Sequence, residues 1–246
     1  MNSSYLTFTN KRVLVVGDVM LDKYWHGGTS RISPEAPVQV VKVSGEENRA
    51  GGAANVALGL AKLGVAVTLV GVVGEDEHAS ALETCLEASG VDCHLMRSSN
   101  SPTITKLRVI SRQQQLIRVD FEESLAQFEH KEAVYRLVED HIQACDAVIF
   151  SDYAKGTLSG VANLIELANQ YKVPSFIDPK GDDFSLYKNA TLVKPNLSEF
   201  ELIVGKCANQ EELFSRGEAL REKYNWRALL VTLGKDGLVL FEQGKA

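Results

Sequence analysis

The sequence RAGGAANVALGLAKLGVAVTLVGVVG, residues 49–74, decides the fold. Apolar side chains recur at helical spacing in its first part and predict a helix over residues 51–64. They are Val56, Leu60 and Leu63. The second part is a continuous apolar run, which is typical of a strand buried on both faces. Two glycines stand where the helix starts, and glycine is useful where something must approach the backbone closely. The stretch therefore predicts a helix followed by a buried strand, and it raises the question of what approaches the two glycines.

Strands and helices alternate along most of the remaining chain. Further strands are predicted at residues 12–21, 146–152, 173–179, 190–196 and 227–241, the last as two strands joined by a tight turn. Further helices are predicted at residues 77–90, 157–171, 197–204 and 209–224. This alternation predicts an α/β fold with a mostly parallel, doubly wound central sheet.

Two stretches depart from the alternation. Residues 37–48 and 102–123 are strand-like, rich in Thr, Val and Ile, and have no helix between their halves. We expect them to form hairpin or lid material that projects from the main sheet. No repeat, linker or second domain boundary is evident, so the interpretation is a single domain over residues 1–246 with an appended lid.

Composition narrows the class of protein. The 246 residues carry 26 basic and 32 acidic side chains, a net charge of −6, which argues against a nucleic-acid surface. No apolar stretch approaches the ~20 residues that span a bilayer, and the polar start, MNSSYLTFTNKR, lacks the apolar core of a signal peptide. The four cysteines form no C-x-x-C pair and the five histidines are scattered. A reduced, cytoplasmic chain without a protein-built transition-metal site is predicted.

Unusual polar residues follow the predicted strands at their carboxyl ends. They are Asp18, Asp152, Asp178, Lys180, Lys194, Asn196, Glu199, Thr232, Gly234 and Gly237. Ligands of an open α/β sheet bind beyond the carboxyl ends of its strands. The sequence therefore predicts that the functional site lies at this edge.

The nucleotide motifs with a defined mechanism are absent. The sequence contains no G-x-x-x-x-G-K-[ST] and no G-x-G-x-x-G after the first strand, which excludes a P-loop and leaves a dinucleotide fold without support. VTLGKDG, residues 231–237, offers another way to hold phosphates, because a glycine-rich turn exposes backbone N–H groups. The same residues also suit an ordinary hairpin turn.

KPNLSEFELIVG, residues 194–205, has two interpretations. Asn196 and Glu199 are three residues apart across a helix start, so an amide and a carboxylate face one ligand, which suits a hydrated Mg²⁺. The alternative is a capping box in which Asn196 caps the helix and Glu199 reaches back. Lys194 beside them favours a phosphate ligand.

Acidic and basic residues meet in two further motifs, SDYAKG (151–156) and DPKG (178–181). Each is either a structural ion pair, worth little if exposed, or part of a mixed-charge pocket for an anionic, polyhydroxylated substrate. Asp18 ends the first buried strand, so its carboxylate must be hydrogen-bonded, either to a ligand hydroxyl or as a cap of the following turn.

The order of these motifs resembles the ribokinase-like carbohydrate kinases. RAGGAANVALGLAKLG, VGVVGEDE, KPNLSE and VTLGKDG carry that resemblance. GDVMLDKYWHGGTSRISPEAPVQVVKV, with SDYAKG and DPKG, is similar to the kinase domain of bacterial heptose 7-phosphate kinases. The resemblance implies a three-layer sandwich with a small β lid, transfer from ATP with Mg²⁺ to the anomeric hydroxyl of a heptose 7-phosphate, and a role in lipopolysaccharide core biosynthesis. It also implies frequent fusion to an adenylyltransferase domain.

The resemblance assigns roles to residues. Gly51, Gly52 and Asn55 are expected to line the sugar pocket, Asp18 to accept hydrogen bonds from sugar hydroxyls, and Lys106 and Arg108 to close over the substrate. Either of the last two, or Lys180, is expected to hold the 7-phosphate, with Asp152 also on the substrate side. Lys194, Asn196, Glu199, Thr232, Gly234 and Gly237 are expected to bind the nucleotide, Asn196 and Glu199 through Mg²⁺. By analogy, a homodimer pairs through the lid.

One departure from the family pattern is important. The G-A-G-D motif, whose Asp is the general base and whose glycines form an anion hole, is absent from the 246 residues. No catalytic residue is therefore assigned within the sequence, and the general-base Asp is expected beyond Ala246. We expect this chain to be a C-terminally truncated kinase with severely impaired turnover, which an extension carrying the motif restores. The alternatives are another sugar kinase of this fold and a non-catalytic sugar-phosphate-binding module.

Overall fold

The computed structural model describes residues 8, 10–123 and 130–242, so most of the polar N-terminal stretch lies outside the described residues. Ala246 lies outside them as well, so the expectation of a general-base Asp beyond Ala246 stays a prediction. The main sheet has eight strands in the order β12-β11-β10-β9-β8-β1-β4-β5, and every neighbouring pair is parallel except β11 with β12. The strands are β1 (Arg12–Gly17), β4 (Ala66–Gly74), β5 (Asp92–Ser98), β8 (Ala147–Ser151), β9 (Ser175–Asp178), β10 (Leu192–Val193), β11 (Ala228–Thr232) and β12 (Leu238–Glu242).

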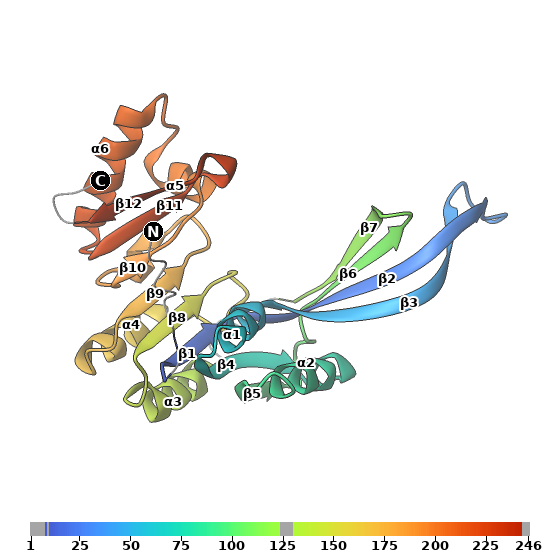
Figure 1. Cartoon of the computed structure of the whole chain (residues 1–246), viewed down its shortest axis with the longest axis horizontal. Coiled ribbons are helices and arrows are strands. Elements are labelled where there is room, and N and C mark those ends of the chain that lie inside the picture. Colours follow the sequence, from blue (N-terminus) through green and yellow to red (C-terminus); the bar gives the residue numbers. More distant parts are fainter. Residues whose placement is uncertain (1–7, 9, 124–129, 243–246) are drawn as a thin grey trace, which may run out of the picture.

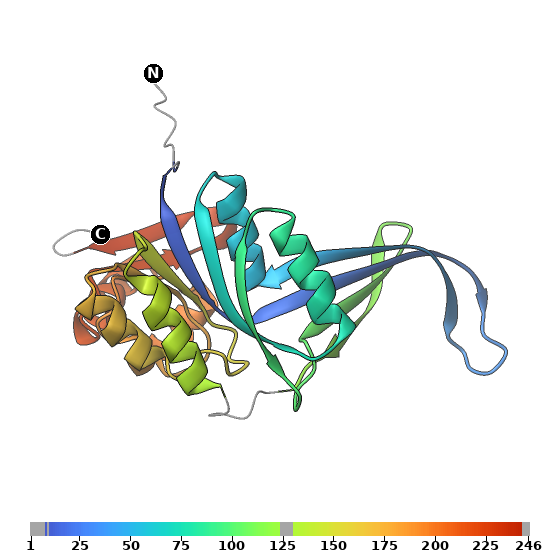
Figure 2. The same cartoon turned by 90° about the horizontal axis from the view of Figure 1, so that it is seen from below.

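Helices cover both faces of this sheet (Figures 1 and 2). They are α1 (Ala53–Lys62), α2 (Glu77–Glu87), α3 (Lys131–Ile142), α4 (Val161–Gln170), α5 (Leu197–Val204) and α6 (Gln210–Lys223), with short 3₁₀ turns η1 (Phe184–Tyr187) and η2 (Gly234–Asp236). None of the helices in the described residues is long and apolar enough to cross a membrane.

The hydrophobic core is divided by the sheet into two halves. On β1, Val13 and Val15 pack with α1 and α2, whereas Leu14 and Val16 pack with the core that includes residues of α3, α4, α5 and α6. A strand whose successive side chains are buried on opposite faces must be apolar throughout, which explains the continuous run in the sequence. The predicted α/β sandwich is confirmed.

A second, four-stranded sheet in the order β3-β2-β6-β7 projects from the first (Figure 1). We call it the lid. Its strands are β2 (Val19–Ile32), β3 (Gln39–Gly52), β6 (Thr105–Ser111) and β7 (Gln114–Phe121). The predicted lid stretches are confirmed as strands, but the lid is larger than predicted, because the whole of β2 belongs to it.

The sequence-based boundaries need three corrections. The strand predicted over 12–21 is two strands of different sheets that meet at Asp18. The helix predicted over 51–64 begins at Ala53, because Gly51 and Gly52 still pair with β2. Three elements were not predicted: the edge strand β5, the helix α3 and the 3₁₀ turn η1.

Candidate functional site

A cleft of about 460 Å³ lies between the lid and the start of α1. All four lid strands, the first turn of α1 and the loop after β8 contribute to its wall. The lining residues are Met20, Asp22, Tyr24, Arg49, Ala50, Gly51, Gly52, Asn55, Lys106, Arg108, Arg118 and Tyr153. The structure therefore brings together five of the residues predicted to bind substrate: Gly51, Gly52, Asn55, Lys106 and Arg108.

Strand register explains why the charged lining residues share one face of the lid. Asp22 pairs with Lys106 on the neighbouring strand, and Tyr24 pairs with Arg108, which in turn pairs with Arg118. Since side chains alternate between the two faces of a strand, these positions all face the cleft. Four cationic side chains and one carboxylate line it. Three of the cations also pair with carboxylates outside this lining, Arg49 with Glu47, Lys106 with Glu122 and Arg118 with Asp120.

Two arginines are held against the ring of Tyr24. The Arg49 and Arg108 guanidinium carbons lie 4.6 Å and 5.2 Å from the ring centroid, within the range of cation–π attraction. Arg108 Nη1 also donates to Asp22 Oδ1 at 2.6 Å. These contacts orient the guanidinium groups of both arginines before any ligand binds.

The structure gives an intramolecular reason for both glycines. A Cβ on Gly51 would stand 2.9 Å from Asp22 Oδ2, and one on Gly52 would stand 2.3 Å from the backbone oxygen of Asp18. Gly52 also has a φ of 55°, in the region that favours glycine. Neighbouring protein atoms therefore already require bare backbone here, and both glycines lie in the cleft wall.

Asp18 ends the first buried strand, as predicted, and lies away from the cleft. Its side chain is fully buried and does not line the cleft. Its carboxylate accepts three backbone N–H groups, from Tyr153 at 2.8 Å, Lys155 at 3.0 Å and Thr157 at 3.1 Å. These three bonds account for the buried carboxylate within the protein, and the expected acceptance of hydrogen bonds from a sugar stays a prediction.

A second cluster forms at the carboxyl ends of β9, β10 and β11. Asn196 Oδ1 accepts the Glu199 N–H at 2.9 Å, and Glu199 Oε2 accepts the Asn196 N–H at 3.0 Å, so the capping-box alternative is observed. Lys180 Nζ donates to the other Glu199 oxygen at 2.9 Å, and Lys194 Nζ donates to Asp178 at 2.8 Å. The cluster is thus internally paired.

The glycine-rich turn lies beside this cluster. Thr232 N–H donates to the Pro195 oxygen at 3.1 Å, and Thr232 forms a parallel bridge with Asn196. Gly234 and Gly237, with φ of 63° and 93°, shape the turn between β11 and β12. All six residues predicted to bind nucleotide therefore lie along one part of the sheet edge, although the turn itself is the ordinary hairpin connection that we considered as the alternative.

Asp152 and Lys180 do not line the cleft, and their expected place on the substrate side stays a prediction. Asp152 accepts the Tyr187 hydroxyl at 2.8 Å and the Ala154 N–H at 2.7 Å, and burial raises the pKa of its carboxyl. The Lys180 N–H donates to the same hydroxyl at 3.3 Å. Asp152 is therefore hydrogen-bonded within the protein, and Lys180 belongs to the cluster around Asn196 because it pairs with Glu199.

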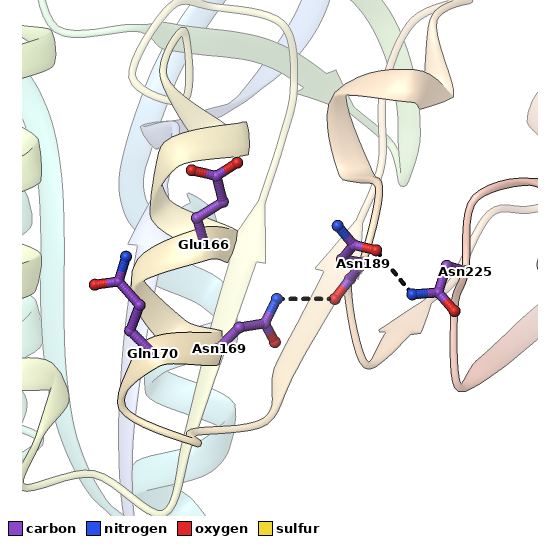
Figure 3. Close-up of a pocket in the computed structure, with 5 residues that line it drawn as sticks. All are labelled: Glu166, Asn169, Gln170, Asn189 and Asn225. Atoms are coloured by element: carbon purple, nitrogen blue, oxygen red, sulfur yellow. Dashed lines mark hydrogen bonds between the residues drawn. The ribbon is translucent and has the colours of Figure 1, made fainter.

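A larger hollow, of about 600 Å³, lies at the opposite edge of the sheet (Figure 3). Glu166, Asn169, Gln170, Asn189 and Asn225 line it, and all five are exposed. Asn189 and Asn225 adopt positive φ values of 64° and 55° just after η1 and α6, as asparagine does at helix ends. Their side chains hydrogen-bond to each other at 2.8 Å. Helix termination accounts for this hollow.

Comparison with known proteins identifies the family. The pattern of the pfkB family carbohydrate kinases matches residues 10–246. The chain belongs to this family. The Bifunctional protein HldE of Marinomonas sp. (strain MWYL1) is 66% identical over 245 residues, covering 100% of this chain and 52% of that protein. The Pseudomonas aeruginosa PAO1 protein of the same name is 51% identical, with 100% and 51% covered. The chain spans about half the length of these relatives.

Solved structures of pfkB-type kinases show the same fold. Arabidopsis thaliana ribokinase complexed with ribose and ATP superposes with a TM-score of 0.69 at 22% identity, covering 97% of this chain and 76% of that one. Escherichia coli phosphofructokinase-2 in complex with fructose-6-phosphate gives 0.73 at 19% identity, with 94% and 77% covered. The predicted ribokinase-like fold is confirmed.

Four charged or aromatic cleft residues of this pfkB chain were missed from the sequence. Asp22, Tyr24 and Arg49 lie on parts of β2 and β3 outside the predicted strands, whereas Arg118 lies within the predicted lid stretch 102–123. Asp22, Tyr24 and Arg49 could have been found from the two-residue spacing that is typical of one face of a strand. Met20, Asp22 and Tyr24 have this spacing, and so do Glu47 and Arg49. Reading 12–21 as one strand concealed it.

Asn196 and Glu199, the residues predicted to hold Mg²⁺, fit coordination through water molecules only. Among the described residues, no group of three or more His, Cys, Asp or Glu side chains is arranged to hold a metal ion. Asn196 and Glu199 are engaged with each other, and Glu199 with Lys180. Such donors suit Mg²⁺ held through water and phosphate oxygens, and not direct chelation.

Proposed function

We propose that the chain is the kinase part of a heptose 7-phosphate kinase. It would transfer the γ-phosphate of ATP to the anomeric O1 of D-glycero-D-manno-heptose 7-phosphate. The observation that carries the proposal is the cleft under the lid, which is lined by Arg49, Lys106, Arg108 and Arg118 and by one carboxylate, that of Asp22. A neutral sugar needs hydroxyl-binding groups only, whereas four cations suit a substrate that already carries a phosphate.

In the proposed reaction, O1 attacks the γ-phosphorus, the bond from that phosphorus to the β,γ-bridging oxygen breaks, and ADP leaves. Lid residues would hold the substrate phosphate, with Asp22 and Asn55 offering acceptor and amide groups to hydroxyls. Lys180, Lys194 and the turn at Gly234–Gly237 would bind nucleotide phosphates, and Asn196 and Glu199 would orient water around Mg²⁺, which supplies charge neutralisation when bound.

The base that takes the O1 proton is not assigned to any residue of the chain. The G-A-G-D motif that would supply it is not among these 246 residues. A chain extended through that motif should phosphorylate heptose 7-phosphate in an ADP-release assay, whereas the 246-residue chain should turn over at least about a hundredfold more slowly, the lower end of what a general base contributes. Equal turnover by the two chains contradicts this placement of the base.

Titration calorimetry tests the substrate class. We expect the chain to bind heptose 7-phosphate at least about tenfold more tightly than the unphosphorylated heptose, since hydrogen bonds to a charged group are worth roughly 1.5–3 kcal/mol. Fructose 6-phosphate is the control for another sugar kinase of this fold. Equal affinity for phosphorylated and unphosphorylated heptose contradicts the proposal, and binding of sugar phosphate without binding of a non-hydrolysable ATP analogue favours the non-catalytic module.

We also propose a homodimer that pairs through the lid. The face of the lid away from the cleft carries Ile117 and Phe121, which are 54% and 49% exposed. Ile117 pairs with Val109, and β-branched and aromatic residues on one exposed face favour association. Sedimentation velocity should show a dimer that Ile117→Lys dissociates. A monomeric wild-type chain at all accessible concentrations contradicts this proposal.

The cytoplasmic location remains a prediction. Its support is the redox state of the cysteines: Cys85, Cys93, Cys145 and Cys207 are all free thiols in the structure, as is usual in a reducing compartment.

A further inference from the structure

We propose that Asp18 is a positioning residue that fixes the loop Tyr153–Thr157 and, through Lys155, ties the main sheet to the lid over the cleft. The inference rests on the proposed function only where it concerns sugar-phosphate affinity. No sugar contact by Asp18 is involved. We call residues 153–157 the anchor loop.

The first step is the bonding of the carboxylate. Asp18 Oδ2 accepts the N–H groups of Tyr153 and Lys155, and Oδ1 accepts that of Thr157. Asp18 lies between β1 and β2, so the anchor loop is bound at the point where the chain leaves the main sheet for the lid. A buried carboxylate with three N–H donors is a strong local constraint, because removing it leaves the buried Thr157 N–H unsatisfied and two part-buried N–H groups without their acceptor.

The second step is what the anchor loop presents. Tyr153 lines the cleft, and Lys155 Nζ donates to Glu122 Oε1 at 2.8 Å. Glu122 directly follows β7 of the lid, and its other oxygen accepts from Lys106 at 3.3 Å. Lys106 in turn lines the cleft. One buried aspartate thereby positions Tyr153 in the cleft lining and, through two ion pairs, the cation of Lys106 in the same lining.

The third step is what an amide would change. In Asp18→Asn the size is conserved, but only one oxygen remains to accept. If that oxygen keeps the Tyr153 and Lys155 donors, the new NH₂ group faces the Thr157 N–H, donor against donor. The anchor loop should then open at Thr157, and Lys155 should lose its fixed position beside Glu122.

Two ligand-free measurements by NMR test this. We expect Asp18→Asn to speed amide exchange at Thr157. We also expect it to raise the pKa of Glu122 toward that of an ordinary glutamate, because the hydrogen bond from Lys155 is the largest cause of its lowered value. Lys155→Ala should raise the Glu122 pKa in the same way. Asp146→Asn is the matched control, since Asp146 accepts the Arg12 N–H at 2.8 Å at the other end of β8 and should change neither readout.

Affinity supplies the third readout. We expect Asp18→Asn to weaken heptose 7-phosphate binding about tenfold, the factor that roughly one lost charged hydrogen bond represents, while the Kd of the ATP analogue changes less than about twofold. The loss of heptose 7-phosphate affinity caused by Lys155→Ala should be smaller in the Asp18→Asn variant than in the wild-type chain, because both changes break the same series of contacts. Thr157 exchange that speeds up with no change in sugar-phosphate affinity overturns the proposal. So does an affinity loss with unchanged exchange, which would indicate direct contact.

A variant-free measurement covers the case in which Asp18→Asn does not fold. In the wild-type chain, the Tyr153, Lys155 and Thr157 amides should exchange as slowly as the core amides of β8, such as Phe150. Faster exchange at all three overturns the proposal. A wild-type chain that binds no heptose 7-phosphate would instead contradict the proposed function, while the exchange and Glu122 readouts would still decide the role of Asp18.

Discussion

Replacing Gly51 by alanine should damage the cleft through a collision that can be located in the structure. The added Cβ would stand 2.8 Å from Met20 Cγ and 2.9 Å from Asp22 Oδ2. Met20 is buried, and the Asp22 carboxylate is held by Arg108 at 2.6 Å, so neither neighbour is free to move. Overpacking of this kind costs about 1–3 kcal/mol.

Gly59 is the matched control, eight residues along the chain. It lies on the exposed side of α1, and a Cβ there meets nothing within 4 Å. Gly59→Ala should stabilise the protein by about 0.5–1 kcal/mol, since alanine is the better helix former. The two glycine-to-alanine changes should therefore differ by about 1.5–4 kcal/mol in the free energy of unfolding.

Urea denaturation followed by circular dichroism measures both variants against wild type. We expect Gly51→Ala to lower the urea concentration at the unfolding midpoint and Gly59→Ala to raise it. Gly51→Ala should also weaken sugar-phosphate binding, since the displaced Asp22 no longer orients Arg108. If the two variants have the same stability within about 0.5 kcal/mol, the packing argument for Gly51 is refuted.

Three further predictions concern charges. Arg108→Gln should weaken heptose 7-phosphate binding about tenfold to a hundredfold with little effect on unphosphorylated heptose; an equal loss for both sugars in calorimetry would show that Arg108 does not read the phosphate. Lys180→Ala, which removes the partner of Glu199 at 2.9 Å, should weaken the ATP analogue roughly fivefold and leave the sugar phosphate unaffected; the reverse pattern would place Lys180 with the substrate. Lys155 lowers the pKa of Glu122, so the stability from that carboxylate is present above the ordinary glutamate pKa and lost as pH falls through the lowered value; Glu122→Gln should reduce the difference in urea midpoint between neutral pH and about pH 4, and an unchanged difference would show that the pair contributes nothing.

The fold followed from local pattern. The apolar run of β1 required burial on both faces, the helical spacing of Val56, Leu60 and Leu63 indicated the helix that became α1, and glycine-rich turns separated the strands. Such signals are contained in short windows, because hydrophobic periodicity reports the local backbone period. Edge strand β5 and helix α3 were missed even so.

The site was predictable only in part, for a different physical reason. The sequence by itself determined the buried strands, the helix after the glycine pair and the polar residues at strand ends, since each depends on neighbours along the chain. Only the tertiary structure decided which aspartate faces the cleft. Asp18 and Asp22 are only four residues apart. The carboxylate of Asp18 is buried and accepts three N–H groups of a loop that is distant in sequence, whereas the pairing of β2 with β6 places Asp22 beside Arg108. Strand pairing and burial between segments more than 80 residues apart set those orientations, and no local window contains them.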